Sequence, residues 1–135
     1  MLKKTINYTD YNGVERKEDF YFNLTKAEIV DMEMGEVGGY SEMIKKIIKT
    51  KDTPSLSKIF KDLILKAYGE KSADGRRFIK SKELSDEFAQ TEAYTELYVE
   101  LLSDDKAAAD FINGITPSIP MEERQKAQKM IEAEL

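Results

Sequence analysis

Two stretches near the N-terminus alternate between polar and apolar side chains with the two-residue period of a β-strand. They cover residues 4–9 and 18–24 and place aromatic side chains on one face. Asn12-Gly13 lies between them and favours a type I′ turn, because both residues tolerate a positive φ. We therefore predict a β-hairpin over residues 3–24. Since a lone hairpin is marginal in water, its aromatic face should pack on helices, or its edge should pair with another chain.

The chain after the hairpin has the apolar spacing that is typical of helices. Thr25 and Glu28 match a capping box, and Thr53-Pro54 reads as an N-cap followed by proline at the first helical position. The first three predicted helices cover residues 25–34, ending at Gly35; 40–50, after a flexible break at Gly38-Gly39; and 53–68, closed by Gly69. Residues 81–103 follow as one helix or as two broken near Gln90-Thr91, capped by Ser81 or Ser85. The last predicted helix covers residues 104–113 and is stopped by Gly114 and the stretch from Pro117 to Pro120. The predicted fold class is therefore α+β, mainly α, with the hairpin packed on a bundle of four to six helices.

The predicted domain is a single globular unit over residues 1–117. A chain of 135 residues is long enough to bury a core without metals or disulfides. Residues 118–135 contain few large apolar side chains, so we expect a loosely docked or disordered C-terminal helix there. Neither a signal peptide nor a membrane span is predicted, because the apolar runs are too short, and the expected location is the cytosol.

A basic, turn-rich segment at residues 68–81 is interpreted as a connector between two helical halves. A basic cluster lies in the second half of this segment and just after it, at Arg76, Arg77, Lys80 and Lys82. Phe78 among them could stack on a base or anchor in a protein pocket. Residues 83–110 are strongly acidic, which offers the alternative that the arginines are neutralised within the fold or across a dimer.

Most catalytic and metal-binding chemistry is excluded by the residue types present. The chain has no cysteine and no histidine, which removes thiol nucleophiles, imidazole bases and the usual zinc ligands. Residues 70–75 superficially match the first half of a calcium-binding EF-hand loop, but Ser81 stands where the bidentate carboxylate is required. No nucleophile, orienting base or phosphate-binding glycine loop is recognisable. We therefore predict a protein that is not an enzyme and that needs no metal and no cofactor.

Several segments resemble the tail assembly chaperones of long-tailed (siphovirus-type) phages and prophages of Gram-positive bacteria. The segments that carry the resemblance are Lys4–Tyr8, Phe20–Glu28, Leu63–Ser72, Asp74–Phe78 and Phe88–Tyr94. The resemblance extends over residues 3 to about 117 and rests on the amino-acid sequences of these segments and on their order along the chain.

The resemblance implies a small non-enzymatic protein that binds the tape measure protein, keeps its hydrophobic helices soluble and recruits tail tube subunits. It also implies a location in the host bacterial cytoplasm and absence from the mature virion. An acidic domain without catalytic residues is compatible with holding apolar partner helices in a groove. The chain is a possible homo-oligomer.

The candidate partner-binding residues form two groups. The first group has largely apolar side chains near the predicted flexible break and consists of Met32, Met34, Tyr40 and Met43. Methionine suits such a surface, because its flexible side chain adapts to a partner helix. The second group is Arg76, Arg77 and Phe78.

Two other functions stay open at this point. A structural virion protein, such as a tail or head-to-tail connector subunit, would also be small and free of cysteine. A nucleic-acid-binding regulator could use the basic cluster, although the net charge of −5 makes nucleic acid an unlikely partner.

Overall fold

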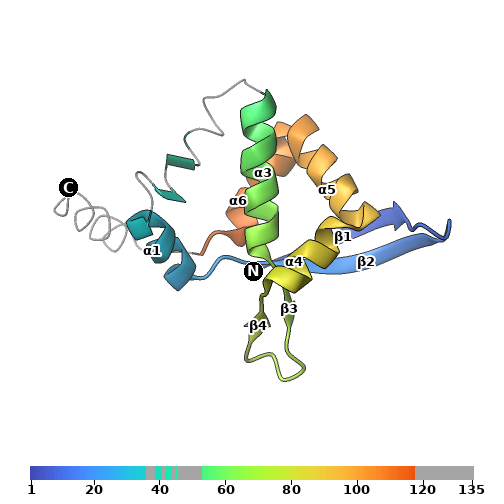
Figure 1. The fold of residues 1–135 in the computed structure, drawn as a ribbon, viewed down its shortest axis with the longest axis horizontal. Helices are drawn as coiled ribbons and strands as arrows, with labels where there is room; N and C mark the ends of the chain where they lie inside the picture. The colour runs from blue at the N-terminus through green and yellow to red at the C-terminus, as the bar shows by residue number, and fades with distance from the viewer. Residues whose placement is uncertain (36–38, 41, 44, 46–52, 118–135) are drawn as a thin grey trace.

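The computed structural model describes residues 1–35, 39–40, 42–43, 45 and 53–117, and all of their side chains except those of Met34 and Thr53. These residues form an antiparallel four-stranded sheet in the order β1-β2-β3-β4 and helices packed on it. Figure 1 shows α3 and α5 above the β1–β2 ribbon, whereas the β3–β4 hairpin projects in the opposite direction. The predicted α+β, mainly α, fold class is confirmed.

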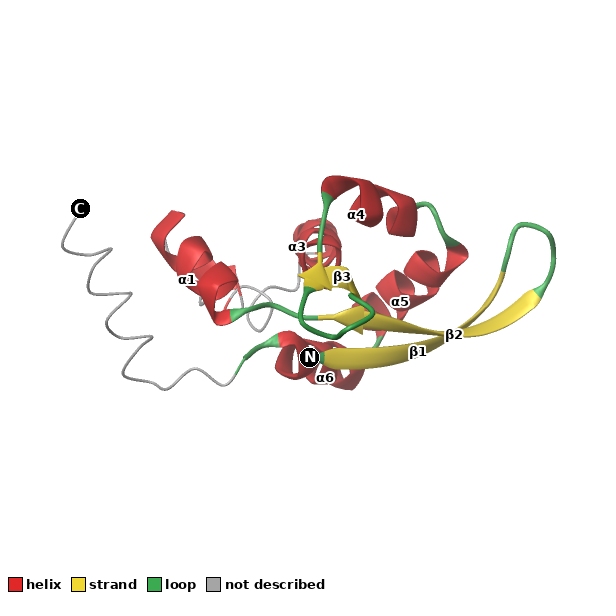
Figure 2. Cartoon of the chain, turned by 90° about the horizontal axis from the view of Figure 1, so that it is seen from below, coloured by secondary structure: helices red, strands yellow, loops and turns green. Residues whose placement is uncertain are grey.

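The N-terminal hairpin consists of β1 (Leu2–Thr9) and β2 (Glu15–Phe22), paired from Leu2↔Phe22 to Thr9↔Glu15. Even-numbered residues of both strands lie on one face because side chains alternate along a strand, and the apolar ones pack in or against the core. Phe22 is fully buried and meets Phe111 edge-on, with ring centroids 5.3 Å apart. The predicted packing of the aromatic face on helices is therefore confirmed. The turn end of the hairpin extends beyond the helices (Figure 2).

The turn of this hairpin differs from the predicted type I′ turn. Only Gly13 has a positive φ, of 80°, whereas a type I′ turn needs positive φ at Asn12 as well. The Gly13 N–H donates to the Asp10 carbonyl at 3.0 Å, and the Asp10 N–H donates to the Val14 carbonyl at 2.9 Å. The Asp10 carboxylate also accepts the N–H groups of Asn12 and Val14. This side chain favours a three-residue loop with one left-handed glycine over the two-residue turn.

The helices are α1 (Lys26–Gly35), α3 (Thr53–Ala67), α4 (Lys82–Ala89), α5 (Glu92–Ser103) and α6 (Asp105–Ile115). The predicted capping box forms at the start of α1: the Glu28 N–H donates to Thr25 Oγ1 at 3.1 Å, and the Thr25 N–H donates to Glu28 Oε1 at 2.9 Å. Most of the helix predicted at 40–50, and Gly38 of the predicted Gly38-Gly39 break, lie outside the described residues.

Helices α4 and α5 are two separate helices, and the break between them lies at Gln90-Thr91, the position that the sequence offered for it. Ser81 caps α4 by accepting the Leu84 N–H at 3.1 Å, so the alternative cap at Ser85 is not used. Thr91 caps α5 in the same way, accepting the Tyr94 N–H at 3.2 Å.

Two glycines do not end helices as predicted. Gly69 lies in β3 (Tyr68–Lys71), which pairs with β2 through Tyr21↔Gly69 and Phe22↔Tyr68. Gly114 lies inside α6, and a Cβ there would meet Leu2 Cδ1 at 2.8 Å. Close tertiary contacts, and not helix ends, thus surround both glycines, and α6 continues to Ile115, just before Thr116 and Pro117.

The predicted connector at 68–81 is a second hairpin. Strand β3 pairs with β4 (Phe78–Ile79) through Glu70↔Ile79 and Lys71↔Phe78. Aromatic packing fixes its base, because the Tyr68 ring stacks on Phe88 of α4 with centroids 4.2 Å apart and planes 6° from parallel. The segment therefore completes the sheet as well as linking α3 to α4.

The core lies between the even-numbered side chains of the first hairpin and helices α3 to α6. Its fully buried large side chains are Phe22, Leu24, Leu63, Ile64, Leu97, Leu101 and Ile115. The predicted domain boundary at residue 117 stays a prediction, because residues 118–135, with their predicted C-terminal helix, lie outside the described residues.

Candidate partner-binding surfaces

A groove of about 560 Å³ lies between α1, Met43 and α3. Its floor is apolar: Met32 is buried on α1, Leu63 is fully buried on α3, and Met43 is half-buried beside them. Such a floor can accept apolar side chains of a partner, and methionine can adjust to their shape.

The rim of the groove is mainly acidic. Among the described residues that line it, Asp31 of α1 and Asp62 of α3 are exposed, Glu28 is half-buried, and Lys66 is the single cation. Glu28 is already engaged by another lysine, Lys80, so the carboxylates of Asp31 and Asp62 are the ones that face an incoming partner. The groove thus combines an apolar floor with unbalanced negative charge.

The structure brings Met32 and Met43 of the predicted first group together in this groove. Tyr40 lies apart from its lining: the ring is buried, and its hydroxyl contacts Thr116 Oγ1 just after α6. The Met34 side chain lies outside the described part of the chain. Half of the predicted group therefore lines one surface.

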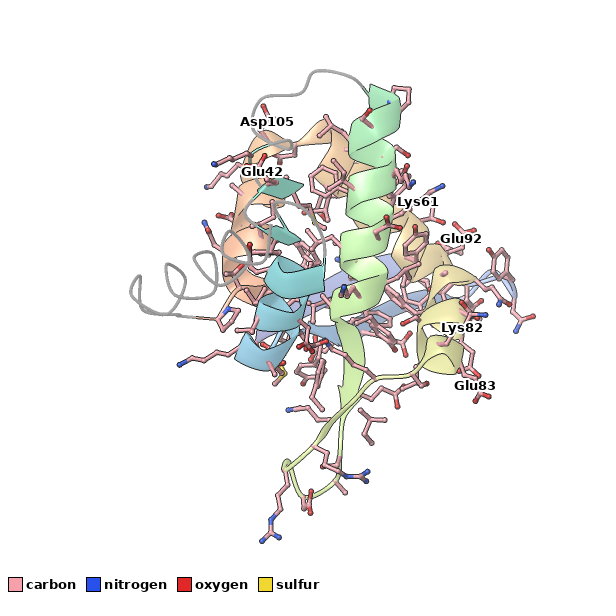
Figure 3. The ribbon with its side chains drawn as sticks, turned by 60° about the vertical axis from the view of Figure 1, so that its left-hand side comes forward. Glu42, Lys61, Lys82, Glu83, Glu92 and Asp105 are labelled. Carbon is pink, nitrogen blue, oxygen red and sulfur yellow. The ribbon has the colours of Figure 1, made fainter. Side chains whose placement is uncertain are left out.

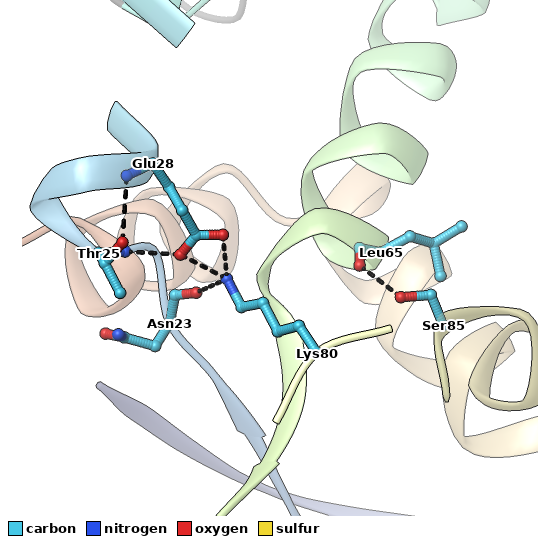
Figure 4. Close-up of polar contacts among 6 residues, drawn as sticks. All are labelled: Asn23, Thr25, Glu28, Leu65, Lys80 and Ser85. Carbon is cyan, nitrogen blue, oxygen red and sulfur yellow. Dashed lines mark hydrogen bonds and ion pairs between the residues drawn. The ribbon is translucent and has the colours of Figure 1, made fainter. Parts of the chain in front are cut away.

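Lys80 ties the second hairpin to the start of α1 (Figure 4). Its ammonium group donates to the Asn23 carbonyl at 2.6 Å and to both carboxylate oxygens of Glu28, at 2.7 and 2.8 Å. Burial by itself raises the pKa of Glu28, but the hydrogen bonds from Lys80 and the Thr25 N–H outweigh burial and hold the pKa below its ordinary 4.5. This Glu28–Lys80 joint leaves no local signal in the sequence, because the two residues are 52 positions apart.

The predicted basic cluster is divided by the fold. Lys80 is engaged by Glu28, and Lys82 makes an exposed i,i+4 contact of 3.8 Å with Asp86. Figure 3 shows the labelled Lys82 and Glu83 on the outer side of α4. Only Arg76 and Arg77 are exposed cations at the turn of the second hairpin, and within the described residues neither makes an ion pair. The described acidic residues of α4 to α6 thus do not neutralise them.

Phe78 lies at the base of this turn, where it is half-buried. A Cβ added to Gly69 would meet the Phe78 ring at 2.7 Å, so the ring lies directly over the β3 backbone. The phenyl group thereby holds the two strands together, while the arginines extend from the turn.

Within the described ranges, no group of three or more acidic side chains is placed to hold a metal ion. No helix among these residues is long and apolar enough to cross a membrane. A family model described as "Phage tail assembly chaperone" matches residues 1–134. The chain belongs to this family. No match was found among the curated proteins or among the solved structures.

Family membership extends the resemblance noted in the sequence. The match covers the C-terminal stretch after Pro120, which the resemblance to about residue 117 left out. Tail assembly chaperones act on tail proteins, so a partner-binding surface is the kind of site that this chaperone requires. The groove and the arginine-bearing turn are two surfaces of the described chain that could meet such partners.

Proposed function

We propose that this chaperone binds the tape measure protein of a long-tailed phage or prophage of Gram-positive bacteria, keeps it soluble and recruits tail tube subunits. It does so in the host cytoplasm, without entering the mature virion and without a catalytic step. The observation that carries the proposal is the groove between α1 and α3, with Met32, Met43 and Leu63 as its floor.

An apolar floor with an acidic rim fits an amphipathic helix that has basic residues beside its apolar face. Insertion of the apolar side chains removes them from water, at about 25 cal/mol for each Å² buried. Basic residues beside them would face Asp31 and Asp62. Met32 and Met43 are thus proposed as tape measure contacts, whereas Tyr40 supports the surface from behind through Thr116. Met34 is also proposed as a tape measure contact, on the basis of its position in the sequence alone.

Arg76, Arg77 and Phe78 form the proposed second surface, on which tube subunits would be recruited. The second hairpin projects away from α3, so a partner held there leaves the groove accessible (Figure 1). Two separate surfaces are what a protein that brings two tail components together requires.

The direct test is co-expression of the full chain with the tape measure protein encoded by the same phage or prophage. The wild-type chain should keep the tape measure protein soluble and co-purify with it. Met43→Asp, which places a charge at the half-buried floor of the groove, should abolish both effects. Val99→Asp, at an exposed position of α5, is the matched control and should behave as the wild type.

Insolubility of the tape measure protein with the wild-type chain would contradict the proposal, and so would equal losses from Met43→Asp and Val99→Asp. Thermal unfolding of each variant distinguishes lost binding from lost folding. Mass spectrometry of purified particles tests the location: recovery of this chain at the stoichiometry of a tail subunit would identify it as a structural virion protein instead.

A further inference from the structure

The second hairpin carries a charge opposite to that of the rest of the chain. Residues 70–80 hold four cations and two carboxylates, a net charge of +2, whereas the whole chain carries −5. The remaining residues therefore carry −7. Lys80 is bound to Glu28, and the Lys71 ammonium lies over the Tyr21 ring, 4.4 Å from its centroid, at the β2 side of the hairpin. The positive charge at the turn itself is therefore that of Arg76 and Arg77.

Hydrogen bonds within the turn fix the backbone that carries the two arginines. Asp74 Oδ1 accepts the Ser72 hydroxyl at 2.7 Å and the Arg76 N–H at 3.0 Å. Ser72 in turn accepts the Arg77 N–H at its hydroxyl, at 3.0 Å, and the Gly75 N–H at its carbonyl, at 2.9 Å. The hydrogen bond from Ser72 and that from the Arg76 N–H hold the pKa of Asp74 below its ordinary value. This carboxylate is thus occupied by the turn and does not pair with either guanidinium.

The base of the hairpin is held from three directions. Tyr68 and Gly69 pair with β2, the Phe78 ring covers Gly69, and Lys80 binds the start of α1. The two arginines therefore extend from a supported element. An ordered element loses less conformational entropy when a partner binds than a free loop does.

We propose that the Arg76-Arg77 turn recognises an acidic protein segment that offers two carboxylates. The planar guanidinium fork pairs with a carboxylate through two parallel hydrogen bonds, which gives geometry as well as charge. The hairpin projects away from α3 and α5, so a short acidic segment can reach the turn from the side opposite to these helices (Figure 1). A nucleic acid would need more cations than two and would bring its long row of phosphates against the remaining −7. The inference deepens the second surface of the proposed function, because it assigns the chemistry of the segment that docks there.

The test measures fluorescence anisotropy of three labelled probes with the full-length chain at low ionic strength. The probes are an oligo-glutamate peptide, an oligo-glutamine peptide of the same length and a single-stranded oligonucleotide of the same net charge. The oligo-glutamate peptide should bind, and the oligo-glutamine peptide should not. Arg76→Gln with Arg77→Gln should weaken oligo-glutamate binding about tenfold, the sum expected for two exposed ion pairs.

The matched control is Lys17→Gln with Lys58→Gln, which removes the same charge from exposed positions of β2 and α3 and should change the affinity less than about twofold. Gly75→Ala keeps both arginines but places a side chain at a φ of 73°, so it should weaken binding by loosening the turn. An unchanged affinity for Gly75→Ala would show that the turn geometry does not matter, and that part of the proposal would be wrong.

Three other results would overturn the assignment: no binding of oligo-glutamate, equal losses in the arginine variant and its control, or tighter binding of the oligonucleotide through the same arginines. The groove variant Met43→Asp keeps the turn intact and should bind oligo-glutamate as the wild type does. Failure of tape measure binding and failure of carboxylate binding are thereby measured separately.

Discussion

Replacement of Lys80 by methionine tests the joint between the second hairpin and α1 most directly. The substitution keeps most of the aliphatic stem and removes an ammonium group that makes three hydrogen bonds. The Lys80 side chain is 21% exposed and that of Glu28 is 28% exposed. An exposed pair stabilises by at most about 1 kcal/mol, and loss of one partner of a fully buried pair costs about 3–5 kcal/mol. We therefore expect Lys80→Met to lower the free energy of unfolding by about 2 kcal/mol, or the melting temperature by about 8 °C for a domain of this size.

A double-mutant cycle with Glu28→Gln, followed by urea unfolding, isolates the pair. We expect a coupling energy of about 1–2 kcal/mol at pH 7. Lys82→Met serves as the control, because its ammonium is almost fully exposed and contacts only Asp86; its effect should stay below about 0.5 kcal/mol. A coupling energy indistinguishable from zero at pH 7 would refute the reasoning.

The same cycle predicts a dependence on pH. The folded-state pKa of Glu28 lies below its ordinary 4.5, so the folded protein binds this proton less tightly than the unfolded chain. The stabilisation is therefore complete above pH 4.5 and is lost as the pH falls through the folded-state pKa. Coupling that stays constant as the pH is lowered through this range would contradict the assignment. Asp10 and Asp74 also have lowered pKa values, which is why the coupling energy and not the total stability must be followed.

Two further predictions concern local structure. Gly69→Ala should destabilise the fold by about 1–3 kcal/mol, because its Cβ would meet the Phe78 ring at 2.7 Å and the Ile79 carbonyl at 2.8 Å. Gly114→Ala should change stability by less than about 1 kcal/mol, since it gains helix propensity and the nearest atoms, at 2.8 and 3.2 Å, belong to the Leu2 side chain, which can shift. Urea unfolding of both variants measures this contrast, and equal losses would count against it. Thr91→Ala should cost about 1 kcal/mol by removing the cap of α5, while Thr95→Ala, at an exposed position within the same helix, should be near neutral. Equal thermal shifts in these two variants would show that the cap contributes nothing.

Local chemistry in the sequence was sufficient to predict the parts of the fold that short-range hydrogen bonds decide. The capping box at Thr25, the cap at Ser81 and the break before Thr91 all depend on residues within three positions of one another. The alternating aromatic residues of the first hairpin likewise predicted its buried face. Such signals lie within a single turn or strand, so they can be recognised without knowledge of the tertiary fold.

The second hairpin could not be predicted in this way, because distant residues determine it. A glycine at the end of a helical pattern normally indicates a C-cap, but Gly69 pairs with Tyr21 and leaves room for Phe78. Strand β4 has only two residues, too few for an alternating pattern. The groove could be predicted only in part: methionines near a flexible break suggested Met32 and Met43, whereas nothing in the sequence indicated that Leu63 of α3 completes the same floor.

The Glu28–Lys80 joint connects the two proposed surfaces, since Glu28 lines the groove and Lys80 holds the base of the hairpin. Met43→Asp should therefore impair only tape measure binding, and the paired arginine substitutions only carboxylate binding. Lys80→Met should weaken both, because it frees the hairpin base and removes the contact that fixes the Glu28 side chain in the groove lining. If the full-length Lys80→Met variant were folded at the assay temperature and lost only one of the two activities, the surfaces would be independent, and the joint would serve stability alone.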